Sequence, residues 1–466
     1  MKTLLTLLLS FIALHNTASG QCFTKISSAF RSNYAQKADG SLWNWGWNSS
    51  FQLGNGDDQT VFIPTPVMIT GSVMAFESGR LNTFVIKSDG TLWGAGGNST
   101  GYLGIGSTVA SPFFVQIGTA TNWRQIESGI LFSFGIRTDN TLWGWGQNNQ
   151  YQMGNNTCCA NQLTPIQIGT DSDWKQVSAC STTSAVLALK NNGTLWGWGT
   201  NITGLIGPSN LTVRTVPTQL SNDTDWAFLD TGSFHALALK NNGTLWAWGA
   251  GDSGQTGDTL PEMFFRDTPV QIGTDTWLTV SAGFDSSYGI KSNGTLWAWG
   301  RNDKSQLGDG TTINRRQPIQ IGTDTDWIAV QGGARHAIAL KSNGALYAWG
   351  ENAFGELGND SDIPATTPLL IPVTGCTLNV ATFDKEIVTL APNPSKNEVN
   401  LTYSGVEANA TVSLYDLSGR ELDTFDLSQT NGTLTMNTQH YPNGIYLVVV
   451  YNQDRIIAQK KLLITH

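Results

Sequence analysis

Few side chains in this sequence have the type and spacing of a catalytic or metal-binding group. The 466 residues include five histidines and five cysteines. They contain no H-E-x-x-H pattern of a zinc protease and no metal-spaced Cys/His cluster, and their G-x-S-x-G match, Gly97–Gly101, does not stand between a strand and a helix as a serine nucleophile of that pattern requires. The aspartates Asp57-Asp58 and Asp171/Asp173 offer oxygen ligands that suit calcium, but they stand in turns, where such side chains bond the local backbone. The sequence therefore predicts no catalytic residue, metal or cofactor, and it leaves calcium binding open.

The histidines His235 and His336 stand at the same position of two related segments, directly before an apolar strand pattern. This repetition favours a structural role, and we expect both side chains to satisfy backbone groups. A glycoside hydrolase would need two carboxylates about 5–10 Å apart in one cleft. Because the sequence does not show which carboxylates meet, a carbohydrate-active enzyme is the alternative to a non-enzymatic protein.

The elements that position these side chains are built around a repeated six-residue phrase. The phrase TLWAWG occurs at Thr244–Gly249 and Thr295–Gly300. Related phrases occupy Ser41–Gly46, Thr91–Gly96, Thr141–Gly146, Thr194–Gly199 and Ala345–Gly350. The turn residues before the seven phrases are separated by 50, 50, 53, 50, 51 and 50 residues. Such a period is typical of propeller blades and of helical repeats.

Strand signals distinguish these two architectures. In the repeat Trp226–Gly273, turn residues separate four apolar runs, which predict strands A to D: Trp226–Thr231, His235–Lys240, Thr244–Gly249 and Pro269–Ile272. The Asn242-Gly243 pair between strands B and C is a strong signal for a two-residue hairpin. Four antiparallel strands in each of seven repeats predict an all-β, seven-bladed β-propeller.

Strand C is expected to have one bulky face and one small face. Trp246 and Trp248 point to one side of the strand, whereas Ala247 and Gly249 point to the other. Twelve of the 18 tryptophans lie in the strand C phrases. Because blades pack face against face at interior density, we expect these indole rings to lie against the alanines and glycines of the neighbouring blade.

The order of the strands also sorts the loops. The A–B and C–D loops lie on one face of the ring, and the B–C turns and D–A connections lie on the other. The second face repeats the same turns, whereas the first varies between blades and is rich in aromatic residues and arginine, which favours recognition of a protein or glycan. The candidate partner-binding residues are Phe30, Arg31, Trp47, Phe51, Arg80, Leu81, Tyr102, Ile130, Leu131, Tyr151, Phe234, Phe284, Asp285, Arg335 and Phe354.

The N-terminus has the features of an export signal. Lys2, the apolar run Leu4–Leu14 and the small residues Ala18-Ser19-Gly20 predict a signal peptide at residues 1–20. Cys22 also admits a lipoprotein, although Gln21 before it is not the small residue that lipidation favours. Removal of the signal changes the net charge from −9 to −10 because Lys2 is lost. We expect no nucleic-acid partner for this acidic chain and no membrane span beyond the signal.

The repeat spelling V-x-A-G-x-x-H-x-x-A-L-K-x-N-G-x-L-x-x-W-G-x-N-x-x-G-x-L-G, matched best at Val330–Gly358, resembles the RCC1 (regulator of chromosome condensation) repeat family. The resemblance implies a seven-bladed propeller over residues 21–376. Members of the family range from guanine-nucleotide exchange factors to a plant ultraviolet photoreceptor and a secreted bacterial β-lactamase inhibitor. The photoreceptor's G-W-R-H-T phrase is absent, and the export signal makes nucleotide exchange a distant alternative. A secreted binding propeller is the nearest physical analogue.

The C-terminal segment 390–466 has a different pattern and resembles the type A sorting domain of the type IX secretion system. The matching features are Ala391–Pro394, Val412–Arg420, Asn443–Leu447 and Lys460–Ile464. The alternating runs at Glu398–Tyr403, Thr411–Leu417, Ile445–Tyr451 and Ile456–Ile464 predict a small β-sandwich. The resemblance implies export by that machinery to the outer surface of a Gram-negative bacterium, or release from it, with removal of the sorting domain. Residues 377–389 are expected to be a linker.

The cysteines offer a way to close the ring. Cys22 and Cys376 each stand one place before the same repeat register, so we expect a disulfide that joins the last blade to the first. Cys158, Cys159 and Cys180 leave two pairings open: one of the adjacent pair bonds Cys180, or the adjacent pair bonds itself. Together the patterns predict a secreted or surface-displayed binding protein whose partner is an extracellular protein or glycan.

Overall fold

The computed structural model describes residues 23–208, 212–258, 265–372, 388–406, 410–415, 421–452 and 455–466. All regular elements in these ranges are β-strands, as predicted. The chain divides into two compact units between Leu378 and Asn379. The predicted signal peptide, the Cys22–Cys376 disulfide and the linker up to residue 387 lie outside the described residues.

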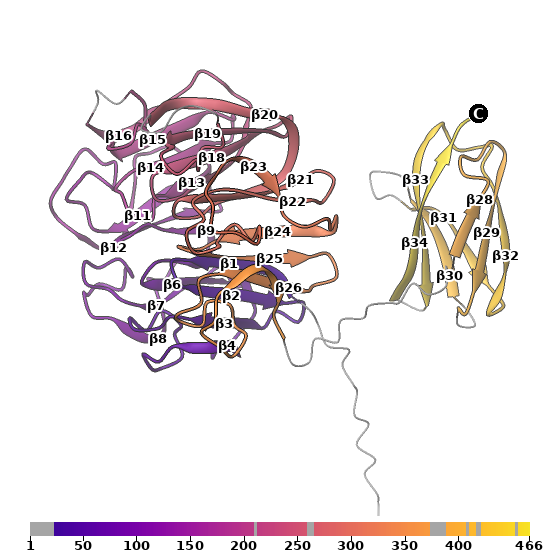
Figure 1. The fold of residues 1–466 in the computed structure, drawn as a ribbon, viewed down its shortest axis with the longest axis horizontal. Coiled ribbons are helices and arrows are strands. Elements are labelled where there is room, and N and C mark those ends of the chain that lie inside the picture. Colours follow the sequence, from indigo (N-terminus) through magenta and orange to yellow (C-terminus); the bar gives the residue numbers. More distant parts are fainter. Residues whose placement is uncertain are drawn as a thin grey trace, which may run out of the picture. The chain divides into compact units, whose positions relative to one another are not determined.

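The first unit is the predicted seven-bladed propeller (Figure 1), in which each blade is an antiparallel sheet with strand order A-B-C-D. Blades one to four contain β1 (Phe23–Ala29), β2 (Ser32–Lys37), β3 (Leu42–Gly46) and β4 (Val61–Pro66); β5 (Val73–Ser78), β6 (Asn82–Lys87), β7 (Leu92–Gly96) and β8 (Ser111–Gln116); β9 (Trp123–Ser128), β10 (Phe132–Arg137), β11 (Leu142–Gly146) and β12 (Gln162–Gln167); and β13 (Trp174–Ala179), β14 (Val186–Lys190), β15 (Leu195–Thr200) and β16 (Val213–Gln219). Blades five to seven contain β17 (Trp226–Thr231), β18 (His235–Lys240) and β19 (Thr244–Ala250); β20 (Phe265–Ala282), β21 (Ser286–Lys291), β22 (Leu296–Gly300) and β23 (Arg315–Gln320); and β24 (Trp327–Gly332), β25 (His336–Lys341), β26 (Leu346–Gly350) and β27 (Ala365–Leu370).

The strand boundaries predicted for blade five agree closely with the structure. Strands A and B match β17 and β18, and β19 extends strand C by one residue. Strand D is part of β20, which pairs with β19 up to Thr276 and continues from Trp277 as strand A of blade six. The A strands of neighbouring blades contact one another, so they form the innermost layer of the ring.

The tryptophans of strand C have two different environments. The second one of each phrase is fully buried in six blades, and blade two has Ala95 at this place. Its Nε1–H donates to a backbone carbonyl of the preceding blade's C–D loop, as Trp299 does to Gln255 at 3.0 Å. The first tryptophan is half-buried and bonds a nearby hydroxyl, as Trp246 does to Thr244 at 3.0 Å.

The predicted partner of the indole rings is correct only in part. The buried rings do touch glycine of the neighbouring blade: a Cβ on Gly308 would come within 2.8 Å of Trp349. This glycine lies in a C–D loop, however, and not in strand C as expected. Alanines of the neighbouring strand C do share apolar clusters with the rings, as expected: Ala247 with Trp299, Ala298 with Trp349 and Ala348 with Trp45. Larger side chains, such as Leu187 and Ile206 around Trp248, complete the contact. Leu187 belongs to strand B of blade four and Ile206 to its C–D loop, so both come from outside the strand C pattern.

The ring closes between blades seven and one, where no peptide bond joins neighbouring sheets. Strands β1 and β24 lie side by side (Figure 1). Trp45 is wholly buried and donates to the Glu356 carbonyl at 2.9 Å, and Asn33 donates to the same carbonyl at 2.8 Å. One apolar cluster includes Ala35 and Trp45 of blade one together with Leu340 of blade seven. Side-chain packing therefore continues around the whole ring.

The second unit is a β-sandwich of two sheets. Its strands are β28 (Val388–Ala391), β29 (Glu398–Ser404), β30 (Ala410–Tyr415), β31 (Glu421–Leu427), β32 (Asn431–Asn437), β33 (Gly444–Asn452) and β34 (Arg455–Ile464). The sheets have the orders β28-β29-β32 and β31-β30-β33-β34, and side chains of both form one core. Four strands were predicted. The strands β28, β31 and β32 were missed, and β28 begins inside the segment predicted to be linker.

Candidate partner-binding face

The A–B and C–D loops lie on the same face of the propeller, as the strand order predicts. The first residue of the C–D loop donates its backbone N–H to the A–B loop of the same blade in several blades. The bonds from Trp47 to Arg31, from Arg301 to Asp285 and from Glu351 to Arg335 are 2.8–2.9 Å long. Neighbouring blades are also joined at this face, because Ala334 donates to the Phe30 carbonyl at 2.8 Å. The varied loops therefore form one continuous surface.

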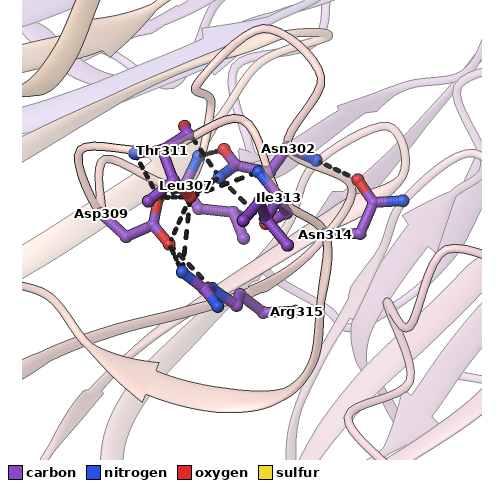
Figure 2. A network of polar contacts seen from close by, with 7 residues as sticks. All are labelled: Asn302, Leu307, Asp309, Thr311, Ile313, Asn314 and Arg315. Carbon is purple, nitrogen blue, oxygen red and sulfur yellow. Dashed lines mark hydrogen bonds and ion pairs between the residues drawn. The ribbon is translucent and has the colours of Figure 1, made fainter.

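A buried asparagine fixes the C–D loop in six of the seven blades, as Figure 2 shows for blade six. The Oδ1 of Asn302 accepts from the Leu307 N–H at 3.0 Å, and its Nδ2 donates to Asp309 and to the Thr311 and Ile313 carbonyls. Arg315 adds an ion pair to Asp309. Equivalent asparagines accept in the same way in blades one, two, three, four and seven, namely Asn48, Asn98, Asn148, Asn201 and Asn352. These bonds hold the loops in one conformation.

Six of the predicted residues gather around one phenylalanine, and we call them the Phe30 cluster. The ring of Phe30 lies 5.7 Å from that of Trp47 and 5.6 Å from that of Phe284, and Phe354 meets Trp47 edge to face at 6.2 Å. The guanidinium of Arg80 lies 4.5 Å from the Phe30 ring, and that of Arg31 lies 4.4 Å from the Phe354 ring. All six are half-buried. Blades one, two, six and seven thus combine into one aromatic and cationic surface.

A hollow of about 300 Å³ opens beside this cluster. Its apolar lining is Phe30, Phe234, Phe284 and Ala334, and its charged lining is Arg31, Asp285, Arg301 and Arg335. Arg301 and Ala334 were not among the predicted residues. Arg301 occupies the position directly after the last glycine of strand C, where blade one has Trp47 and blade seven has Glu351. This varied position was the signal in the sequence that could have revealed it.

The charges around the hollow are unequally paired. Arg301 bonds both oxygens of Asp303 at 2.8 and 3.0 Å and also reaches Asp285 at 3.3 Å. These contacts raise the pKa of Arg301, whereas burial raises the pKa of Asp285 despite its contact with Arg301. Arg31 and Arg335 share a single carboxylate, Glu351, at 3.5 and 4.0 Å. The buried Nε of Arg31 has no hydrogen-bond partner among the described residues.

The centre of the ring holds an acidic group that the sequence analysis missed. Glu77, Glu127 and Asp230 line a small cavity of about 80 Å³ on the axis of the propeller. Burial and the neighbouring carboxylate raise the pKa of Glu77 to about 8, and burial raises that of Asp230 to about 6. Burial and both neighbours also raise the pKa of Glu127. Each carboxyl is the fifth residue of a strand A, a position that is polar in every blade.

The two repeat histidines are structural, as expected, but their partners are side chains and not backbone groups. His235 bonds the Ser287 hydroxyl at 2.8 Å, and His336 bonds Asn33 at 2.9 Å. Each bond therefore joins neighbouring blades. Burial lowers the pKa of both histidines to about 3, so both are neutral at physiological pH.

The aspartates considered for calcium are engaged locally. Asp171 and Asp173 both pair with Lys190, at 2.7 and 3.1 Å, and Asp57 accepts from Asn48. No group of three or more metal-ligating side chains occurs among the described residues. The open cysteine pairing is also decided, because Cys158 bonds Cys159 and Cys180 is a buried free thiol.

The remaining predicted residues are outside the Phe30 cluster. Tyr102 is 3% exposed and packs under its loop, so its assignment to the binding surface is wrong. Ile130 is half-buried and packs against the core shared with blade four. The other four are half-buried and lie elsewhere on the same face: Phe51, Leu81, Leu131 and Tyr151. Phe51 and Tyr151 hold φ angles of 62° and 60° where four other blades have glycine, so their aromatic side chains cost backbone strain.

The profile of the RCC1-like domain matches residues 125–389, which is more than half of the chain. This protein belongs to the RCC1-like family. A single RCC1 repeat profile also matches residues 39–86 of this RCC1-like propeller. The secretion system C-terminal sorting domain matches residues 389–465, so the RCC1-like protein is secreted or displayed at the cell surface. Among the described residues, no helix is long and apolar enough to cross a membrane.

Two solved structures illustrate the similarity of the fold. Human WBSCR16 is 20% identical, with a TM-score of 0.62 over 69% of this chain and 87% of its own. Prp20p from Saccharomyces cerevisiae, studied for its binding to Gsp1p and histones, is 17% identical, with a TM-score of 0.64 over 80% of this chain and 90% of its own. At these identities the similarity concerns the propeller fold alone.

Proposed function

We propose that this protein is a binding protein of the outer cell surface or extracellular medium that recognises a protein or glycan partner through the Phe30 cluster. The type IX secretion system of a Gram-negative bacterium exports it, and the sorting domain is removed after export. The observation that carries the proposal is the convergence of four aromatic rings and two arginines from four blades. Aromatic residues and arginine provide most of the binding energy at protein interfaces.

The loops that carry this surface are suited to binding because they are already ordered. Bonds like those of Asn302 hold the C–D loop in six blades, and backbone bonds join A–B loops of neighbouring blades. A surface that is rigid before binding loses little conformational entropy when the partner docks. The structure thus supports recognition by a preformed face.

A carbohydrate-active enzyme is the second candidate, and the carboxylates at the centre of the ring are the observation in its favour. The cavity between Glu77, Glu127 and Asp230 measures about 80 Å³, which is room for a few water molecules but not for a sugar ring. A glycosidase also needs space for its substrate between the two carboxyl groups. Binding is therefore the better-supported function, and nucleotide exchange gains no specific support.

The proposal is tested by capture of partners from the native environment of the secreted protein. Replacing Trp47 and Phe284 with alanine should lower capture at least tenfold, because each loses a half-buried aromatic anchor. The matched control is Leu278→Ala with Ile328→Ala, two exposed apolar residues at the opposite end of strand A from the A–B loops, 57% and 42% exposed. Capture that survives in the first pair or fails in the control pair would refute the proposal, provided that circular dichroism shows both variants folded.

A further inference from the structure

The hollow beside the Phe30 cluster has a chemistry that narrows the choice of partner. We propose that it binds a short acidic peptide segment of a partner protein, with an apolar side chain among the phenylalanine rings and a carboxylate at Arg31 and Arg335. This inference rests on the proposed function and specifies the partner of the same face.

The arginines at the hollow are unevenly paired with carboxylates. Two guanidiniums, those of Arg31 and Arg335, face one carboxylate, Glu351, at distances longer than a close ion pair. Because neither guanidinium makes a close contact with Glu351 and the side chains are 24% and 37% exposed, a second carboxylate at these two arginines would be favourable. Arg301 does not contribute in the same way, since Asp303 and Asp285 already occupy it.

The apolar lining of the hollow fits an apolar side chain. Phe30, Phe234 and Phe284 surround the hollow, and Ala334 completes the apolar part of its lining. A volume of about 300 Å³ lies at the small end of the range for ligand pockets, which suits one or two side chains better than a folded domain. An aliphatic or aromatic side chain would remove its surface from water there without leaving a polar group unpaired.

The hydrogen-bonding groups of the lining favour a peptide over a glycan. Sugar hydroxyls need acceptors as well as donors, but arginine donates only. The lining contains no amide or hydroxyl side chain, and its single carboxylate, Asp285, is already bonded to Arg301. Guanidiniums match the two oxygens of a carboxylate geometrically. The hollow therefore fits an acidic group beside an apolar one, as a peptide presents them.

The overall charge of the chain makes this hollow distinctive. The net charge is −9, so most of the molecule repels an acidic partner at long range. The loosely paired guanidiniums of Arg31 and Arg335 then fix where such a partner docks, and binding should weaken as salt increases.

A random hexapeptide display library selected on the immobilised full chain is the direct test. We expect enrichment of Asp or Glu next to Phe, Leu or Ile. A recovered acidic peptide should bind about 10- to 100-fold more weakly to the variant Arg31→Gln with Arg335→Gln. The charge-matched control, Lys304→Gln with Lys396→Gln, changes two exposed lysines outside the hollow and should bind the peptide normally.

A second variant keeps the test decisive if the arginine variant folds poorly. Glu351→Gln removes the shared carboxylate, so Arg31 and Arg335 become free and the recovered peptide should bind several-fold more tightly. Enrichment of basic or hydroxyl-rich peptides, or no enrichment, would overturn the inference. Acidic peptides that bind the double arginine variant and Glu351→Gln as tightly as they bind the unchanged chain would also overturn the inference. Glycans bound on an array and lost with Trp47→Ala and Phe284→Ala would overturn the peptide inference while leaving the proposed function intact.

Discussion

The carboxyl groups at the centre of the ring should give the propeller an unusual pH dependence. Because the pKa of Glu77 is raised from 4.5 to about 8, the folded chain holds this proton more tightly than the unfolded chain. The free energy of unfolding should therefore rise as the pH falls from 8.5 to 6.5. Below pH 6.5 the gain should level off, because His235 and His336 stay neutral in the folded chain and take up protons only on unfolding, which offsets the protons held by the buried carboxyl groups.

The size of the effect follows from the shift. Each pKa unit corresponds to about 1.4 kcal/mol, so protonation of Glu77 between pH 8.5 and 6.5 should add about 1–2 kcal/mol to the free energy of unfolding. Glu127 contributes in the same direction because its pKa is also raised. In the variant Glu77→Gln, most of this gain should be lost, and the variant should be more stable than the unchanged chain at pH 8.5.

Urea unfolding followed by tryptophan fluorescence measures this directly. All 18 tryptophans lie between Trp43 and Trp349, so the signal reports the propeller and not the sorting domain. The control Asp362→Asn removes one exposed carboxylate and should keep the gain between pH 8.5 and 6.5. If the unchanged chain shows no gain, or if Glu77→Gln shows the same gain, then the carboxyl groups do not titrate as described.

Three further predictions concern the closure of the ring and the cysteines. Trp45→Ala should destabilise the propeller by about 3–5 kcal/mol, because it removes a fully buried ring and its hydrogen bond to Glu356. Trp43→Ala removes a half-buried ring and should cost less than half of that free energy. Equal losses of the two variants in urea unfolding would contradict the described closure of the ring. Peptide mapping without reduction should show Cys158 bonded to Cys159 and Cys22 bonded to Cys376. Cys180 should resist alkylation until the chain unfolds, because burial raises the pKa of its thiol to about 12; rapid labelling of the folded protein would disprove this.

The repeat architecture could be predicted from the sequence because each blade contains the same local signals. The Asn242-Gly243 turn and the phrase at Thr244–Gly249 placed strands A to C of blade five within one residue. The loop face was also correct, since it follows from strand order alone. Local patterns thus fixed the strands, their order and the varied face.

The contacts between blades were harder to predict because they join residues far apart in the chain. Phe30 meets Phe284, and Arg31 meets Glu351, only after the ring closes. Tyr102 was assigned to the surface because it stands in a varied loop, although its side chain turns inward. Glu77 and Asp230 were missed because each looks like an ordinary polar residue of a half-buried strand until seven strands are arranged around one axis.

The most direct test of the account is photo-crosslinking of the partner from a single position on each face. A photoreactive phenylalanine analogue in place of Phe284, at the edge of the hollow, should yield a covalent adduct with the captured partner. The same analogue in place of Leu278, at the other end of its blade's strand A, should yield none. An adduct at position 278 without one at position 284 would contradict the assignment of the binding face.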